Sequence, residues 1–325
     1  MIIGRRTLLA LAGTAALGAP GALRAQAQPP RTMRLGVLGD SMSAPLAVVF
    51  QLLRERGWEI GRNLIIESRW AEGDLTRLPA LARELVVAQV DVIYASGDLA
   101  AAAAAQASTA IPVVMHGLAP VELGLAKSLA RPGGNVTGVT YEADAEAGKK
   151  IDLLRAMRPG LQRIGIIYRD DLPVTQVYYA RWKASADRVG ITLIKLPAPI
   201  MVADLDATLA AAARERVQVI EFAFNPALRG TGWQRIAAWA AQHQVLTSAA
   251  TGHSGDSMLA FGPNPMHFYG LVLDQIDRVL RGARPADLPI QQPSLFDTVI
   301  HKRQIQAIGL TVPTVVLLQA TEVIE

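Results

Sequence analysis

The sequence predicts an α/β protein built from two doubly wound, Rossmann-like lobes. Short runs rich in Val and Ile alternate with longer segments of helical period, the pattern of parallel sheets covered by helices. This alternation starts again near residue 146, which indicates two sheets. With 325 residues, 51% of them hydrophobic and 18% charged, the chain is long enough to bury a core in each lobe.

In the first lobe, each short apolar run is followed by a segment of helical period. Strands are expected at 33–39, 63–70, 91–96, 111–117 and 135–141, and helices at 44–56, 75–88, 98–107 and 121–130. Asp74 is the expected N-cap of the second helix. In the segment SLARPGGNVTG, Pro132 ends the fourth helix, and Gly133 and Gly134 allow the turn into the fifth strand. The glycines therefore favour a connector over a phosphate site.

The second lobe repeats the pattern. Strands are expected at 163–169, 191–197, 217–224, 244–249 and 257–262, and helices at 146–157, 174–189, 204–214 and 233–242. A tail follows that is too small for a third domain: a helix at 264–280, a proline-rich extended segment at 283–296, a strand at 297–301 and a helix at 303–308. We expect it to pass back over the first lobe and return to the second.

These crossings give the predicted domain limits. The first lobe comprises residues 28–140 plus 262–290, and the second comprises residues 141–261 plus 291–325.

Residues 1–27 have the pattern of a secretory signal peptide. Arg5 and Arg6 precede an apolar stretch at 8–23, and Ala25-Gln26-Ala27 supplies small residues for cleavage after Ala27. Glycines and a proline interrupt the apolar stretch, which leaves it short for a membrane span. We expect export to the periplasm by the Sec or twin-arginine route.

Charge and cysteine content exclude several classes of partner and site. Without residues 1–27, 29 basic and 28 acidic residues remain, a formal balance of +1. No Lys/Arg stripe stands out, so nucleic-acid binding is not expected. The chain has no cysteine, which excludes disulfides, thiol catalysis and thiolate metal sites.

Catalytic and cofactor motifs are absent from the sequence. There is no P-loop and no complete G-x-G-x-x-G, and the five histidines show no metal-ligand spacing. The stretch GHSGD at 252–256 lacks the second glycine of G-x-S-x-G. We expect no cofactor, no metal and no enzymatic activity.

Three segments carry a family resemblance: RWAEGDLTRLPALARELV at 69–86, SLARPGGNVTGV at 128–139 and RGARPADLPIQQPSLFDTVI at 281–300. They closely resemble ABC transporter substrate-binding proteins of the leucine/isoleucine/valine-binding-like branch, which includes aromatic amino-acid binders. The resemblance implies a type I periplasmic binding protein fold, with three interdomain crossings and a small-molecule solute held between the lobes. It also implies an ABC transporter permease in the inner membrane as the partner. We expect a monomer.

Ligands in open α/β sheets bind beyond the carboxyl ends of the strands, where helix N-termini offer unpaired amides. Applied to both lobes, this rule selects the following ligand-binding candidates: Asp40, Ser41, Ser43, Trp70, Ser96, Gly97, His116, Thr137, Tyr168, Asn225 and Ser248.

The candidates differ in chemistry and each has a competing structural role. Asp40 can accept from an ammonium, and the serines that follow it suit a carboxylate, but Ser43 equally serves as a helix N-cap. Trp70 equally packs on its own loop. Asp98 is expected to cap its helix. A lone histidine such as His116 is more often structural than a ligand contact.

In the second lobe, Tyr168 and Asn225 are placed to supply an aromatic ring and an amide, which suit an amphipathic solute. For Phe222 and Phe224, packing in the core is the competing role. The loop at 247–256, which holds Ser248, lacks the bulkier aromatic and charged segment usual in the family.

The predicted function is a periplasmic receptor that captures a small organic solute, such as an amino acid or related carboxylate, by hinge closure. Two alternatives remain open: a solute sensor for a signalling partner, and a secreted enzyme on two Rossmann-like domains.

Overall fold

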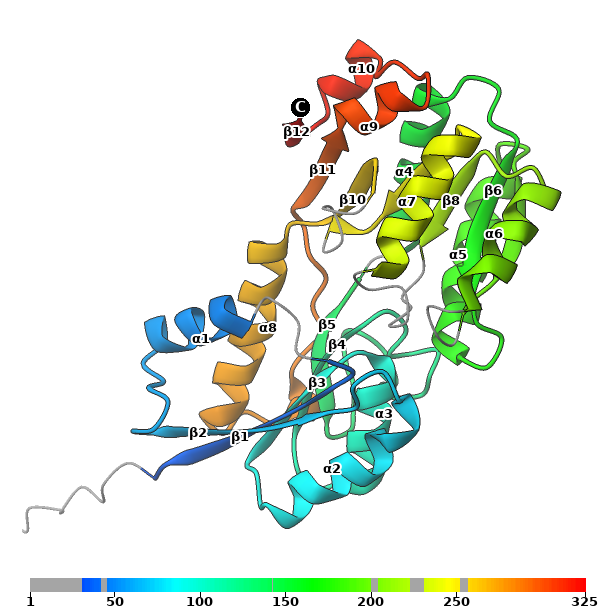
Figure 1. Cartoon of the computed structure of the whole chain (residues 1–325). Coiled ribbons are helices and arrows are strands. Elements are labelled where there is room, and N and C mark those ends of the chain that lie inside the picture. The colour runs from blue at the N-terminus through cyan, green and yellow to red at the C-terminus, as the bar shows by residue number, and fades with distance from the viewer. Residues whose placement is uncertain (1–30, 42–45, 142, 200–203, 223–230, 252–256) are drawn as a thin grey trace, which may run out of the picture. The chain divides into compact units, whose positions relative to one another are not determined.

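Two separate β-sheets organise the protein (Figure 1). The computed structural model describes residues 31–325 except 42–45, 142, 200–203, 223–230 and 252–256. The expected signal peptide and the candidates Ser43 and Asn225 lie outside the described residues. The first sheet has the strand order β2-β1-β3-β4-β5 and the second has the order β12-β11-β10-β9-β8-β6-β7. The predicted α/β fold class is thereby confirmed.

The first sheet is parallel throughout. Its strands are β1 (Met33–Gly39), β2 (Leu64–Trp70), β3 (Val92–Ser96), β4 (Val113–Gly117) and β5 (Val136–Thr140). Helices α1 (Leu46–Glu55) and α8 (Pro265–Leu280) cover one face, and α2 (Leu78–Val87) and α3 (Asp98–Ala107) cover the other. Side chains alternate across a strand, so Val37 packs in the cluster with α8, whereas Leu38 packs in the cluster with α2 and α3.

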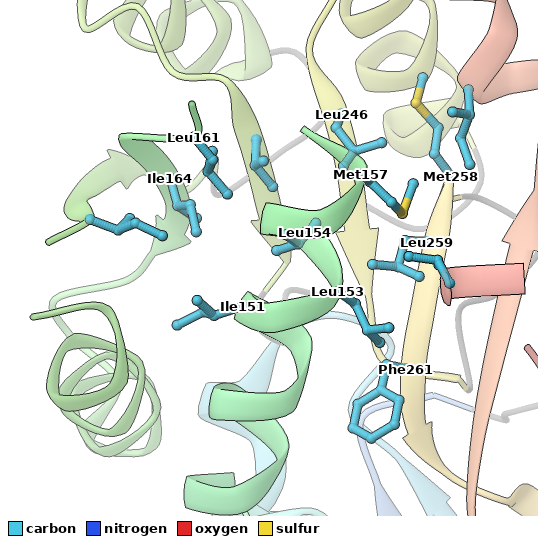
Figure 2. Packing of buried hydrophobic residues seen from close by; sticks show 14 of the residues in the cluster. Ile151, Leu153, Leu154, Met157, Leu161, Ile164, Leu246, Met258, Leu259 and Phe261 are labelled. Atoms are coloured by element: carbon cyan, nitrogen blue, oxygen red, sulfur yellow. The ribbon is translucent and has the colours of Figure 1, made fainter. Parts of the chain in front are cut away.

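The second sheet is parallel except where β11 runs antiparallel to β10. Its strands are β6 (Arg163–Tyr168), β7 (Thr192–Pro197), β8 (Val219–Phe222), β9 (Leu246–Ala249), β10 (Leu259–Pro263), β11 (Phe296–His301) and β12 (Glu322–Ile324). Its helices are α4 (Ala143–Met157), α5 (Pro173–Asp187), α6 (Leu205–Arg214), α7 (Thr231–His243), α9 (Lys302–Ala307) and α10 (Thr314–Leu317). In Figure 2, Leu154 and Met157 of α4 lie with Leu246 and Leu259 in the core of this sheet.

The helix predicted at 121–130 is wrong: residues 121–124 form turns, and residues 125–130 contain only bends and irregular chain. Gly124 has φ 70°, a left-handed conformation that closes a single turn after Pro120. Beyond it, the amide of Lys127 donates to the carbonyl of Pro132 instead of continuing a helix. The left-handed conformation of Gly124 therefore ends the segment after a single turn.

Two smaller differences occur at element ends. Asp74 caps a 3₁₀ turn at Leu75–Arg77 by accepting from the amide of Thr76, and α2 begins only at Leu78. Helix α10 and strand β12, which are only four and three residues long, were not predicted from the sequence.

The extended segment after α8 pairs with β5, the outer strand of the first sheet. The amide of Gln291 donates to the carbonyl of Gly138 (2.9 Å), and the amide of Thr140 donates to the carbonyl of Gln291 (2.8 Å). Through the described residues the chain thus leaves the first sheet after β5, returns to it in α8, and leaves it again before β11. The domain limits given above stay a prediction.

Thr137 belongs to this pairing. Its side chain is fully buried, and its hydroxyl donates to the carbonyl of Leu288 (2.8 Å). This position favours a structural role over the ligand contact predicted from the sequence.

Gly138 is required by the close approach of β4. Its φ is 147°, and a Cβ built on it would lie 1.9 Å from the carbonyl oxygen of Met115. A side chain here would force β4 and β5 apart.

We expect Gly138→Ala to lower the free energy of unfolding by about 3 kcal/mol or more, because it combines backbone strain with a clash against β4. Urea unfolding followed by circular dichroism measures the change. Gly134→Ala is the matched control, since a Cβ at Gly134 meets no atom within 4 Å. Equal stability of the two variants would contradict the assignment.

Thr137→Val keeps the shape of the side chain but leaves the carbonyl of Leu288 without its hydroxyl donor. We expect a loss of about 1–3 kcal/mol in the free energy of unfolding. Thr192→Val, at an exposed position on the edge strand β7, should change it little. No loss in Thr137→Val would show that the hydrogen bond does not hold the crossing.

Candidate functional site

Four of the predicted residues meet at the carboxyl edge of the first sheet. In the strand register, Gly39 lies opposite both Trp70 and Ser96, and Ser96 lies opposite His116. A Cβ on Gly39 would lie 2.9 Å from Cζ3 of Trp70 and 3.0 Å from Cβ of Ser96. The ring of Trp70 therefore lies against Gly39, and Ser96 and His116 continue the same edge. Gly97 follows directly after Ser96.

Asp40 and Ser41 follow β1 at this edge and carry polar atoms without partners. Asp40 is 7% exposed, and its Oδ1 accepts from the amide of Gly73 (3.1 Å). Within the described part of the chain, its Oδ2 and the Oγ of Ser41 are buried and have no hydrogen-bond partner. Because an unpaired buried carboxylate oxygen is costly, this oxygen is suited to a donor from a bound molecule.

Asp98 fastens the start of α3 to the chain after β4. Its two carboxylate oxygens accept from the amides of Leu118 and Ala119 (both 2.9 Å). Burial raises the pKa of Asp98, and the hydrogen bonds from these two amides oppose that rise. Gly97 is the N-cap at φ 106°, and its amide donates to the carbonyl of His116 (2.9 Å). Both residues are thus engaged by the protein's own backbone.

Four aromatic residues that were not predicted from the sequence surround His116. The ring centroids of Tyr94 and Phe268 lie 5.7 Å from that of His116, and those of Tyr141 and Tyr269 lie at 6.3 and 6.4 Å. Tyr141 stacks on Phe268 at 4.8 Å. We call these five residues the aromatic cluster. Its members come from β3, β4, the chain after β5 and α8.

The aromatic cluster is electrically neutral near pH 7. Burial lowers the pKa of His116 to about 4, so its imidazole is uncharged, and burial raises the pKa of Tyr94 well above its usual value. The Tyr94 hydroxyl and Nδ1 of His116 share a hydrogen bond of 2.7 Å. His116, Tyr141 and Tyr269 are only partly buried. They offer an uncharged ring surface suited to an apolar or aromatic group.

Tyr168 and Ser248 lie in the second sheet. Tyr168 ends β6 as predicted but is buried, with Tyr179 edge-on at 5.4 Å and Nζ of Lys195 4.0 Å above its ring. Ser248 in β9 is fully buried, and its Oγ has no partner among the residues described. Among the described residues, no hydrogen bond, ion pair or ring contact joins Tyr168 or Ser248 to the aromatic cluster.

A buried set of charged residues was also missed. Lys150 of α4 is 1% exposed, and its Nζ lies 2.8 Å from Oε1 of Glu221 and 3.8 Å from Oε1 of Glu146. Glu221 is fully buried in β8 and also accepts from the hydroxyl of Tyr178 (2.7 Å). We call Glu146, Lys150, Tyr178 and Glu221 the charged cluster. The i, i+4 spacing of Glu146 and Lys150 was the signal in the sequence, although it is equally common on exposed helices.

Glu146 has a longer contact with Lys150 than Glu221 has, 3.8 Å against 2.8 Å. Burial raises its pKa to about 7; Lys150 opposes the rise and Glu221 adds to it. Its Oε1 would lie 3.5 Å from a Cβ on Gly262, at the point where β10 leads into α8. The charge of Glu146 also contributes to the raised pKa of Tyr141, for which burial is the main cause. Glu146 therefore lies within electrostatic reach of the aromatic cluster.

The described residues contain no group of three or more His, Asp or Glu side chains arranged to hold a metal ion. None of their helices is long and apolar enough to cross a membrane.

Comparison with known proteins identifies the family. Residues 35–324 match the family model described as ABC transporter substrate binding protein. A tyrosine-binding protein of Clostridioides difficile (strain R20291) is 35% identical over 117 residues, which are 36% of this chain and 33% of that protein. The match thus spans about a third of the relative's length.

Solved structures show the same fold at low sequence identity. A conserved domain protein of Vibrio cholerae O1 biovar El Tor has a TM-score of 0.83 and 24% identity, covering 90% of this chain and all of that one. An ABC domain from Streptococcus pneumonia in complex with L-Trp has a TM-score of 0.82, with the same identity and coverage. The type I periplasmic binding protein fold predicted from the sequence is confirmed. Because the family model matches from β1 to β12, the chain belongs to the ABC transporter substrate-binding protein family.

Proposed function

We propose that the protein is the exported solute receptor of an ABC importer, which captures a small organic solute and delivers it to a permease in the inner membrane. Membership of the substrate-binding family and the signal-peptide pattern of residues 1–27 support this proposal. Binding, and not catalysis, is the proposed activity.

The observation that carries the proposal is the set of side chains at the carboxyl edge of the first sheet. The aromatic cluster offers uncharged rings, and Asp40 offers a buried carboxylate oxygen to which no donor among the described residues bonds. This combination suits an amphipathic solute with one apolar end and one hydrogen-bonding end. The tyrosine-binding relative and the neighbour in complex with L-Trp support an amino acid with a large side chain as the solute.

The chain's passage between the two sheets supports a closing motion. A solute that contacts both halves stabilises the closed arrangement by its differential affinity for it. The segments that absorb the motion are the crossings after β5, after β10 and before β11.

Titration of the mature protein with the twenty L-amino acids, followed by small-angle scattering of each complex, tests the proposal. We expect saturable binding of at least one large amino acid and a smaller radius of gyration in its complex, because the bound solute joins both halves. Tight binding with an unchanged radius of gyration would contradict the closing motion, and no binding across the panel would contradict the proposed solute class.

His116→Leu should weaken binding of L-tryptophan or L-tyrosine about tenfold, roughly 1.4 kcal/mol, because it removes a ring from the aromatic cluster and its hydrogen bond with Tyr94. His243→Leu is the matched control, since His243 is exposed and stacks on Trp239 of α7. Calorimetry measures both affinities, and thermal unfolding confirms that both variants fold. An unchanged affinity in His116→Leu would remove the aromatic cluster from the site.

A further inference from the structure

The charged cluster has one positive charge for two carboxylates. Glu146 and Glu221 both face Lys150, whose Nζ lies 3.8 Å from the first and 2.8 Å from the second. Buried charges are stable only when they are paired and hydrogen-bonded. The cluster therefore lacks one cation or holds one proton in its place.

The two carboxylates do not share Lys150 equally. Glu221 receives both the short contact from Lys150 and the hydroxyl of Tyr178. Among the described residues, Glu146 has only the longer contact with Lys150. Oε2 of Glu221 is also buried and has no hydrogen-bond partner among the described residues, so neither carboxylate is fully compensated, and Glu146 differs from Glu221 in lacking a short contact with Lys150.

Glu146 is also the member of the pair that solvent reaches. Its side chain is 13% exposed, whereas that of Glu221 is fully buried. It lies in the first part of α4, directly after the crossing from β5, and its carboxylate lies against Gly262 at the crossing into α8. Both crossings are segments on which the proposed closing motion depends.

The groups facing Glu146 come from every element around it. Lys150 is on its own helix, Glu221 on β8 and Tyr178 on α5, while Tyr141 follows β5. At the crossing from β10, Gly262 brings no ionisable side chain. Lys150 is fully enclosed and already paired, so it is not available to a solute carboxylate.

We infer that Glu146 receives a protonated amine of the solute, and that the protein selects amine-bearing solutes over the corresponding acids. This inference rests on the proposed function and concerns the same site. The amine supplies the cation that the charged cluster lacks, while the apolar part of the solute lies toward Tyr141 and the aromatic cluster.

The inference has a definite pH dependence. Glu146, with a pKa of about 7, carries a proton below that pH, and a bound ammonium must displace it. Affinity for an amine therefore rises as pH increases toward 7, by about tenfold per unit well below the pKa, and levels off above it. A primary alkyl amine stays protonated over this range, since its pKa is about 10.

The test uses matched sets of probes: L-tyrosine, tyramine and 3-(4-hydroxyphenyl)propionate, and the equivalent three compounds derived from tryptophan and from leucine. Calorimetry at pH 8 should show that at least one amine binds about tenfold or more tightly than its acid analogue. At pH 7, two buffers of different ionisation enthalpy should reveal release of about half a proton per amine bound, because the carboxyl is then half protonated.

Glu146→Gln should weaken amine binding at least about tenfold, abolish the proton release, and reduce the ratio of amine affinity to acid affinity toward one. Asp152→Asn is the matched control on the same helix, since the side chain of Asp152 is 69% exposed. A thermal melt at pH 8 should show Glu146→Gln to be at least as stable as the wild type, because the substitution removes a poorly compensated buried carboxylate.

The outcomes separate this inference from the proposed function. If acid analogues bind as tightly as amines, or if Glu146→Gln binds amines normally, the inference is wrong and the receptor function stands. If no compound of any set binds the wild type, both the proposed solute class and the inference are wrong.

Discussion

The pairing of the segment around Gln291 with β5 holds the chain that follows α8 against the first sheet. It ties the chain that returns from α8 to the first sheet through two backbone hydrogen bonds and the hydroxyl of Thr137. Because α8 is held on this sheet, Phe268 and Tyr269 lie beside His116 of β4, although they are more than 150 residues away in the sequence. At Gly138, β4 and β5 approach so closely that a Cβ would lie 1.9 Å from the carbonyl oxygen of Met115.

The site combines two regions of opposite character. The aromatic cluster is uncharged near neutral pH because burial keeps His116 neutral. The charged cluster carries one cation and two carboxylates, and it begins at the helix that follows the crossing from β5. Tyr141 and Glu146 are only five residues apart in the chain, and the charge of Glu146 adds to the rise in the pKa of Tyr141 that burial mainly causes. The crossing between the sheets therefore brings the rings of the aromatic cluster near the carboxylate of Glu146, whose charge Lys150 only partly compensates.

Local pattern was sufficient to predict most elements of the fold. Strands such as Val92–Ser96 are short apolar runs between turn signals, and α8 begins with Asn264 before Pro265 as an N-cap and first residue. The helix predicted at 121–130 failed because the left-handed Gly124 interrupts an otherwise helical period. The edge residues Trp70, Ser96 and His116 could be predicted since parallel strands end together. The aromatic and charged clusters could not, because their members meet only through the fold: Lys150 has the same local pattern whether it faces Glu221 or water.

A crystal structure of the protein with an amine that it binds in solution would show directly which side chains hold the solute. We expect the amine nitrogen at about 3 Å from the carboxylate of Glu146, with the apolar part of the solute against the rings of His116 and Tyr141. A solute bound away from these side chains, with Glu146 still facing Lys150 alone, would contradict this expectation.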